Sequence, residues 1–217
     1  MVRPAPDGAR TEDQVVPRGR AGARRGAQLG AGLVLYAASV ALLVHPALGS
    51  MPWDVLSQGV ARVTGWTFGT TTVVISLVVL VCWVPLRQRP GVGTAANVLV
   101  IGALVDPFLA LAAMLPEPLP LAVRVAMVVL GVGVNAVATG LYVGARLGPG
   151  PRDGLMTGLV ARTGHPVRWV RGAIEVLVVA AGWALGGTVG LGTLAYALAI
   201  GPLVHVLLPR LTVPTEG

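Results

Sequence analysis

The chain has 217 residues, of which 54% are hydrophobic and only 12% are charged. Apolar residues at this frequency, gathered in long runs, exclude an ordinary soluble domain and indicate an integral membrane protein. The formal net charge of +7 comes entirely from arginine, and in a membrane protein such an excess reports orientation rather than nucleic-acid binding. We therefore expect the lipid bilayer, and no nucleic acid, as a partner. The single cysteine, Cys82, excludes a disulfide framework and a cysteine-based metal site.

The first 25 residues are rich in Pro, Gly, Ala and Arg and have no apolar periodicity, which predicts a disordered cytoplasmic tail. Arg24 and Arg25 at its end are expected to hold it inside the cell. A basic stretch followed by an apolar one also fits a cleaved signal peptide, but this tail is long and no clear cleavage site follows it. The first span is predicted at residues 26–44, with His45 marking its outer end.

Five further apolar runs are each close to the roughly 20 residues that a helix needs to cross the hydrocarbon layer. They lie at residues 68–86, 93–115, 121–145, 170–185 and 191–208. The run at 170–185 is short and glycine-rich, and it carries Arg171 and Glu175 one helical turn apart, which predicts a local ion pair. We predict an all-α membrane helix bundle of six transmembrane helices, followed by a short cytoplasmic tail at 209–217.

An internal repeat relates the two halves of the sequence. The stretch LGSMPWDVLSQGVARVTG at residues 48–65 returns 99 positions later as LGPGPRDGLMTGLVARTG at residues 147–164. The same offset aligns the apolar runs on both sides without a gap, which indicates a tandem duplication. The first three-helix repeat covers residues 26–115, and the second covers residues 119–208.

Each repeat contains three spans, an odd number, so the second repeat must begin on the opposite side of the membrane from the first. This is the inverted-repeat arrangement of many secondary transporters. The arginines support it, because Arg87 and Arg89 follow the second span of the first repeat and have no counterpart in the second. The long loop of the second repeat instead carries its own set, at Arg146, Arg152, Arg162, Arg168 and Arg171. The positive-inside rule then places both termini in the cytoplasm.

The repeated loop predicts a short amphipathic helix in each half. Pro52 and Pro151 suit the first turn of a helix, and Asp54 and Asp153 then lie near the positive end of the helix dipole. Such a helix is too short to span the membrane, so it lies in the interface or dips in as a re-entrant segment. The two aspartates either stabilise their helices or act as symmetry-related gate residues, one at each membrane face.

These motifs resemble those of a known family. The pattern LGSMPWDVLSQGVARVTGWTFGT, followed by PLRQRPGVGT, resembles the YczE/YyaS/YitT-type bacterial integral membrane proteins, and the arginine-only, Gly- and Ala-rich composition is similar to that of an actinobacterial member. The resemblance covers about residues 30–208. It implies the multi-pass fold and a bacterial cytoplasmic-membrane location, and it implies no established activity. The second repeat departs from the motif at Arg152, which stands where the first has Trp53.

Several polar residues inside the predicted spans are candidates for a solute or ion path. Asp106 is the most unexpected, because a carboxylate inside an apolar span is costly unless it faces a cavity or a partner. Its counterpart in the second repeat is His205, so the two form a candidate proton- or cation-handling pair. Alternatively, Asp106 lies nearer the outer interface and His205 simply lies near the end of the last span. Asn97 and Asn135 either bond between helices or line a substrate path.

The sequence contains no nucleophile paired with a base, no HExxH and no P-loop, so we expect no enzyme activity, no cofactor and no metal. The leading hypothesis is a small-solute secondary transporter or exporter with its site between the two repeats. The alternative is a non-transporting accessory protein that binds or stabilises a protein partner, since polar groups within the spans are sparse. The substrate, the coupling ion and a homo-oligomeric state stay open.

Overall fold

A computed structural model describes residues 20–213, and there it contains eight α-helices and no strands. The helices are α1 (Arg20–Val44), α2 (Pro52–Thr64), α3 (Phe68–Leu86), α4 (Val92–Ala112), α5 (Leu121–Gly144), α6 (Pro151–Thr163), α7 (Val167–Ala184) and α8 (Leu191–Leu211). Five are long and apolar enough to cross a membrane, namely Gly22–Val44 of α1 together with α3, α4, α5 and α8. The predicted all-helical membrane fold is confirmed in this form.

The helix bounds differ from the prediction mainly at the two ends of the chain. Because α1 begins at Arg20, Arg24 and Arg25 are helical rather than part of a disordered tail, and residues 1–19 lie outside the described part. Arginine and alanine favour the helix, so nothing in this stretch stops it before the apolar run. At the other end, α8 continues to Leu211, into the predicted tail. The predicted span at 170–185 corresponds to α7, which is not among the five candidates.

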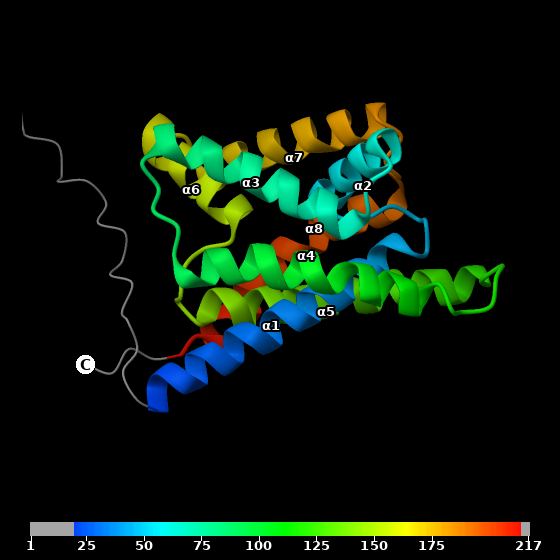
Figure 1. Ribbon diagram of the computed structural model, residues 1–217, viewed down its shortest axis with the longest axis horizontal. Coiled ribbons are helices and arrows are strands. Elements are labelled where there is room, and N and C mark those ends of the chain that lie inside the picture. The colour runs from blue at the N-terminus through cyan, green and yellow to red at the C-terminus, as the bar shows by residue number, and fades with distance from the viewer. Residues whose placement is uncertain (1–19, 214–217) are drawn as a thin grey trace, which may run out of the picture.

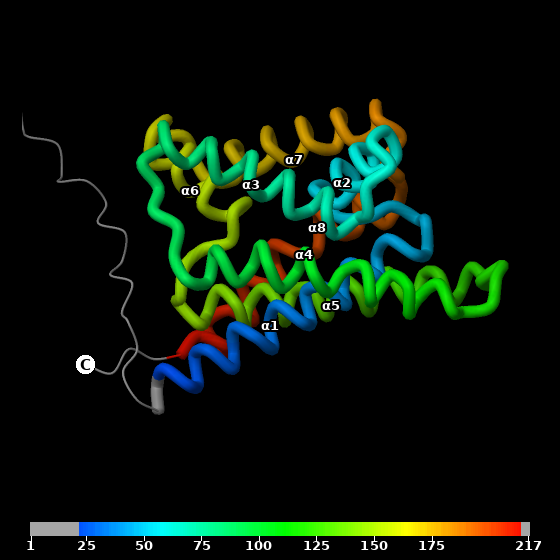
Figure 2. The backbone as a smooth tube through the Cα atoms, viewed as in Figure 1, coloured from blue at the N-terminus to red at the C-terminus, as the bar shows by residue number. Residues whose placement is uncertain are grey.

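The helices form two layers (Figure 1). In one layer, α1 packs on α4 and α5, and α5 packs on α8. In the other, α2 packs on α7 and α6 packs on α3. Figure 2 shows that the short helices α2 and α6 lie toward opposite ends of this second layer. Each short helix is therefore held by a long helix from the other half of the sequence.

The duplication is visible in the backbone. The short helices α2 and α6 have the same bounds after a shift of 99 residues, and so do α4 and α8. Residues with positive φ also come in corresponding pairs: Ala47 and Arg146, Gly49 and Gly148, Gly65 and Gly164, Arg87 and Gly186. The Gly93 amide donates to the Leu147 carbonyl at 2.7 Å. The Gly192 amide donates to the corresponding carbonyl of Leu48 at 2.8 Å.

Side-chain size is complementary where the two halves exchange their short helices. The ring of Trp83 in α3 covers Gly154 in α6, where an added Cβ would lie 2.0 Å from a ring carbon. At the corresponding positions of the other contact, Gly182 in α7 faces Val55 in α2. The large residue is thus on the long helix in one contact and on the short helix in the other. In both contacts a large residue of one repeat packs against a glycine of the other, so each repeat contributes to the packing of its partner.

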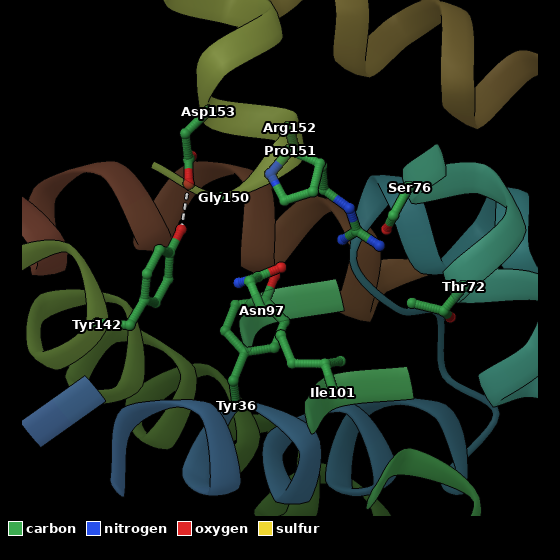
Figure 3. Close-up of a pocket in the computed structure, with 10 residues that line it drawn as sticks. All are labelled: Tyr36, Thr72, Ser76, Asn97, Ile101, Tyr142, Gly150, Pro151, Arg152 and Asp153. Atoms are coloured by element: carbon green, nitrogen blue, oxygen red, sulfur yellow. Dashed lines mark hydrogen bonds between the residues drawn. The ribbon is translucent and has the colours of Figure 1, made fainter. Parts of the chain in front are cut away.

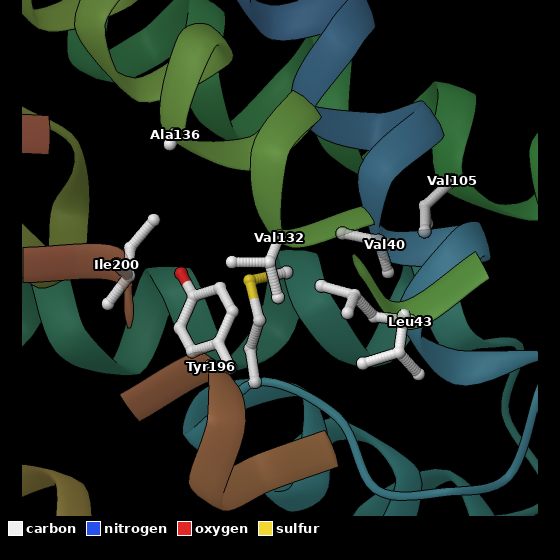
Figure 4. Close-up of a cluster of buried hydrophobic side chains, with 9 residues drawn as sticks. Val40, Leu43, Val105, Val132, Ala136, Tyr196 and Ile200 are labelled. Carbon is white, nitrogen blue, oxygen red and sulfur yellow. The ribbon is translucent and has the colours of Figure 1, made fainter. Parts of the chain in front are cut away.

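The main core joins the long helices of the first layer. α1 and α5 run antiparallel, since Gly32 in α1 meets Tyr142 near the end of α5, and Leu43 near the end of α1 meets Gly131 in α5. Figure 4 shows the apolar cluster that fills the space between α1, α4, α5 and α8, with labelled residues Val40, Leu43, Val105, Val132, Ala136, Tyr196 and Ile200.

The outward faces of the long helices are apolar. Val84 in α3 is 76% exposed, and Leu198 in α8 is 69% exposed. Monomeric soluble proteins rarely present so much continuous apolar surface to water. In a bilayer these side chains contact lipid tails, so the polar chemistry of the protein has to be sought in its interior.

Candidate functional site

The two short helices begin in the interior and run apart toward opposite ends of the protein (Figures 1 and 2). Pro52 of α2 and Pro151 of α6 are buried, each in the first turn of its helix as predicted. Thr64 and Thr163, at the far ends, are exposed. Backbone N–H groups at a helix start have no partner within the helix, so both positive helix ends point into the protein.

Side chains of the first layer and of α3 hold the start of α6 in place. The Trp83 indole N–H donates to the Pro151 carbonyl at 3.0 Å. The Thr94 hydroxyl donates to the Pro149 carbonyl at 2.7 Å. These contacts direct the next residue, Arg152, toward α2.

Asp54 and Asp153 lie in one interior region rather than at opposite membrane faces. Arg152 Nη1 is 3.7 Å from Asp54 Oδ1. Asp153 accepts a hydrogen bond from the Tyr142 hydroxyl. Both aspartates belong to the inward-directed N-terminal ends of their helices, and a gating role for them stays a prediction.

The Asp54 carboxyl is buried, and few hydrogen bonds offset the cost of removing its charge from water. Its side chain is 1% exposed, and its Oδ2 has no hydrogen-bond partner among the described residues. It lies in the first turn of α2, whose N-cap residue is Met51. Burial raises the pKa of the Asp54 carboxyl from 3.8 to about 6, against the opposing charge of Arg152. Burial also raises the pKa of Asp153, which the hydrogen bond from Tyr142 and the charge of Arg152 oppose.

Arg152 places a positive charge where the two halves meet. Its side chain is 20% exposed, and its guanidinium carbon lies 5.2 Å from the centre of the Trp53 ring, a cation–π contact. The sequence predicted Arg152 to be a topology determinant in a cytoplasmic loop. The structure places Arg152 in the first turn of α6, where it forms an ion pair with Asp54.

A polar cavity of about 50 Å³ lies beside Arg152. Figure 3 shows the guanidinium extending toward Ser76, with Asn97 and Tyr36 on the opposite wall. The cavity is lined by residues of both halves: Tyr36, Thr72, Ser76, Asn97, Ile101, Tyr142, Gly150, Pro151, Arg152 and Asp153. Since one water needs roughly 10–15 Å³ of such volume, the cavity can hold a few water molecules or one small ion.

All three tyrosines of the chain lie at this junction. Tyr36 and Tyr142 line the cavity with their ring centres 6.1 Å apart. The Tyr196 hydroxyl donates to Asn135 Oδ1 at 2.8 Å, and the Asn135 amide donates to Ser39 at 2.9 Å. Asn135 therefore bonds between helices, one of the two roles predicted for it, whereas Asn97 lines the cavity.

Corresponding positions of the two repeats carry different side chains here. Asn135 occupies the position of Tyr36, and Tyr196 occupies the position of Asn97. Trp53 and Arg152 form a third such pair. The sequence analysis did not predict the tyrosines as site residues, because a tyrosine within a span is also common as a packing residue. Their scarcity, with three in the whole chain, was the available signal.

The structure does not bring Asp106 and His205 to this junction. Asp106 Oδ1 accepts a hydrogen bond of 2.8 Å from the Gly69 amide in the first turn of α3. Its carboxylate therefore stabilises the positive end of that helix. His205 is exposed on α8, and neither residue lines the cavity. The predicted ion pair of Arg171 with Glu175 is confirmed at 2.8 Å.

Between residues 20 and 213, no group of three or more His, Cys, Asp or Glu side chains is arranged to hold a metal ion.

Five apolar helices, lipid-type outer faces and an ion pair buried between two repeats define a polytopic membrane protein. The chain belongs to a family of unknown function, DUF6198, whose model matches residues 23–209. The sequence resemblance to proteins of the YczE and YyaS type is thereby confirmed.

Three relatives illustrate this family likeness. The chain is 38% identical over 182 residues to an uncharacterized protein of Haemophilus influenzae, covering 81% of this chain and 82% of that protein. It is 34% identical over 182 residues to the uncharacterized membrane protein YczE of Bacillus subtilis, covering 83% of each. It is 23% identical over 181 residues to the uncharacterized protein YyaS of Bacillus subtilis, covering 83% of this chain and 90% of that protein. No solved structure matches the chain.

Proposed function

We propose that this protein is a secondary transporter or exporter of a small solute in the bacterial cytoplasmic membrane, with its translocation site at the junction around Arg152. The observation that carries the proposal is the buried Asp54–Arg152 ion pair beside a polar cavity to which both halves contribute. Ionisable groups buried in membrane proteins mark ion and substrate paths. In transporters with repeated halves, the site lies between the repeats, near inward-pointing helix starts.

The proposed topology has six spans in two inverted repeats, with α2 and α6 as re-entrant segments. The antiparallel packing of α1 and α5 supports the inversion, since these are the first helices of the two repeats. α7 is the sixth span: its outer face exposes Val176 and Leu177, and its Arg171 is neutralised by Glu175. The inner ends of α2 and α6 are covered by protein, which a re-entrant backbone requires.

The proposed orientation puts the N-terminal end of α1 in the cytoplasm. Gln28 near this end donates to the Leu211 carbonyl at the end of α8 at 2.6 Å. Gly158 of α6 approaches Leu86 at the end of α3. Figure 1 shows these ends together at one side of the protein. Arginines gather there, at Arg24, Arg25, Arg87, Arg89, Arg162 and Arg210, and the positive-inside rule assigns that side to the cytoplasm.

A flux assay in proteoliposomes tests the proposal, with a library of small metabolites as solutes. We expect Arg152→Gln to reduce flux by tenfold or more, because it leaves the carboxylates of the junction without their counter-ion. Two matched controls are Asp106→Asn, which retains an oxygen that can accept from Gly69, and His205→Ala on the exposed face of α8. Both should keep wild-type flux. Loss of flux in Asp106→Asn with full flux in Arg152→Gln would move the site away from the junction.

The size of the cavity favours a second candidate, a membrane accessory protein that stabilises a partner. Pockets for small-molecule ligands usually have volumes of about 300–1,000 Å³, and this cavity measures about 50 Å³. Absence of flux for every solute tested, together with stoichiometric co-purification of one partner protein, would favour this candidate.

A further inference from the structure

We infer that Asp54 is a reversible proton-binding site and that Arg152 is the counter-ion that controls it. The inference names the coupling ion of the junction and in that respect rests on the proposed transport function, but proton binding itself can be measured without transport.

The first argument is the charge balance around Asp54. With both carboxylates ionised, Asp54, Asp153 and Arg152 together carry one excess negative charge. Arg171 lies near Asp153, but Glu175 neutralises it at 2.8 Å. An excess charge in an interior region is costly. One proton on a carboxylate oxygen removes it.

The surroundings of Asp54 offer little further compensation. Arg152 faces it from α6, and the hydroxyls of Tyr36 and Tyr196 lie within electrostatic range from α1 and α8. The two long helices that pack on α2 present neutral groups. α7 contributes Gly182 beside Val55, and Gly187 after the end of α7 lies there too. α3 contributes the Thr72 hydroxyl beside Ser57.

The second argument is the difference between the two corresponding aspartates. Asp153 receives a hydrogen bond from Tyr142, and the residue that corresponds to Tyr142 in the first repeat is Leu43, which lies in the apolar core. Asp54 therefore lacks the hydroxyl that its counterpart has, and its buried Oδ2 has no partner among the described residues. A proton from water forms an O–H bond there and converts the carboxylate to the neutral acid.

Protonation also changes what the cavity presents to a solute. Arg152 both pairs with Asp54 and lines the cavity. When Asp54 is neutral, the guanidinium loses one of its two neighbouring negative charges, and the cavity becomes more positive by that amount. The proton and the solute are thereby coupled through a single side chain.

Infrared titration of the purified protein in lipid nanodiscs tests the inference. We expect the C=O stretch of one carboxylic acid to disappear as the pH rises through about 6, and Asp54→Asn to remove this band. Asp106→Asn, which removes a carboxylate outside the junction, should keep the band and its midpoint. Arg152→Gln should raise the midpoint by about 1–3 pH units, since an opposite charge at this distance lowers a carboxyl pKa by that amount. Arg152→Lys, which retains the positive charge, should bring the midpoint close to the wild-type value.

The Arg152 variants keep Asp54 itself intact, so they test the inference even if Asp54→Asn fails to fold. A titrating band that persists in Asp54→Asn, or a midpoint that is the same in Arg152→Gln and in the wild type, would overturn it. Solute flux without titration of Asp54 would support the proposed transport function and refute Asp54 as a proton-binding site. Titration of Asp54 without any solute flux would support the proton-binding site and refute the proposed transport function.

Discussion

At the scale of single residues, the junction depends on how the two repeats have diverged. Trp53 and Arg152 occupy corresponding positions, and in the folded protein the cation of one lies over the ring of the other. Tyr36 and Asn135 form another diverged pair, both in the interior. Two identical repeats would bring like groups together at their shared centre, and two arginines there would repel. Divergence instead supplies one cation, several hydroxyls and two carboxylates of unequal environment.

The stability of the protein is expected to depend on pH through Asp54. Folding raises the pKa of this carboxyl from 3.8 to about 6. Its contribution to stability is therefore fully present below about pH 4 and is lost as the pH rises through about 6. Asp54→Asn removes the charge and leaves Arg152 with one carboxylate, Asp153. At pH 8 this variant should be more stable than the wild type, by at most about 3 kcal/mol, seen as a higher Tm by intrinsic fluorescence.

The same comparison at low pH is the control. Well below pH 3.8 the wild-type carboxyl is protonated in both the folded and the unfolded state, so the Tm difference should shrink toward zero as the pH falls. A difference of equal size at pH 4 and at pH 8 would mean that the substitution acts through packing, and the charge argument would be refuted.

At the scale of helices, glycine determines how closely the short helices approach their partners. Gly59 of α2 faces Gly182 of α7, and a Cβ at Gly59 would lie 2.4 Å from the Gly182 carbonyl oxygen. A backbone atom cannot give way as a flexible side chain can. This close approach fixes the depth at which α2 enters the protein, and with it the position of Asp54, five residues earlier.

Gly59→Ala is expected to push α2 away from α7 and to destabilise the protein by about 1–3 kcal/mol, the usual cost of overpacking. The Tm in detergent should fall by several degrees. The matched control is Gly133→Ala in α5, where an added Cβ meets nothing within 4 Å. This control should be neutral or slightly stabilising, because alanine favours the helix by about 1 kcal/mol over glycine. An equal loss in both variants would contradict the contact.

At the scale of the whole molecule, the exchange of short helices ties the halves together. Because α2 packs on α7 and α6 packs on α3, neither repeat can place its short helix without the other. A rearrangement of one half therefore displaces an inner helix end that belongs to the other half. This is the mechanical link that alternating exposure of a shared site would use in the proposed transporter.

Labelling of single cysteines tests the proposed topology. The exposed residues Thr64 and Thr163, at the outer ends of α2 and α6, are the sites to use. The exposed Cys82 is first replaced in a Cys82→Ala background. With a membrane-impermeant maleimide on intact cells, Thr64→Cys should react and Thr163→Cys should react only after permeabilisation. Reaction of both from the same side would rule out inverted repeats.

Most of the helices and the duplication follow from local signals in the chain. Pro52 and Gly65 bracket α2 because proline suits a first turn and glycine adopts the left-handed conformation that ends a helix. The span predicted at 68–86 has the same bounds as α3. Such features depend on residues adjacent in sequence, and the fixed offset of 99 carries them from one half to the other.

The site, by contrast, depends on contacts between distant residues. Apolar periodicity describes the length of a short helix but not which end points inward, and this direction places Asp54 beside Arg152 instead of at an opposite face. The role of Asp106 depends on packing for the same reason. This residue is prominent in the sequence as a carboxylate within a span, and because α3 packs on α4 it accepts a hydrogen bond from the first turn of α3. Local sequence thus determined the helices and their duplication, whereas tertiary packing selected which buried charges meet, because an ion pair depends on distance in space.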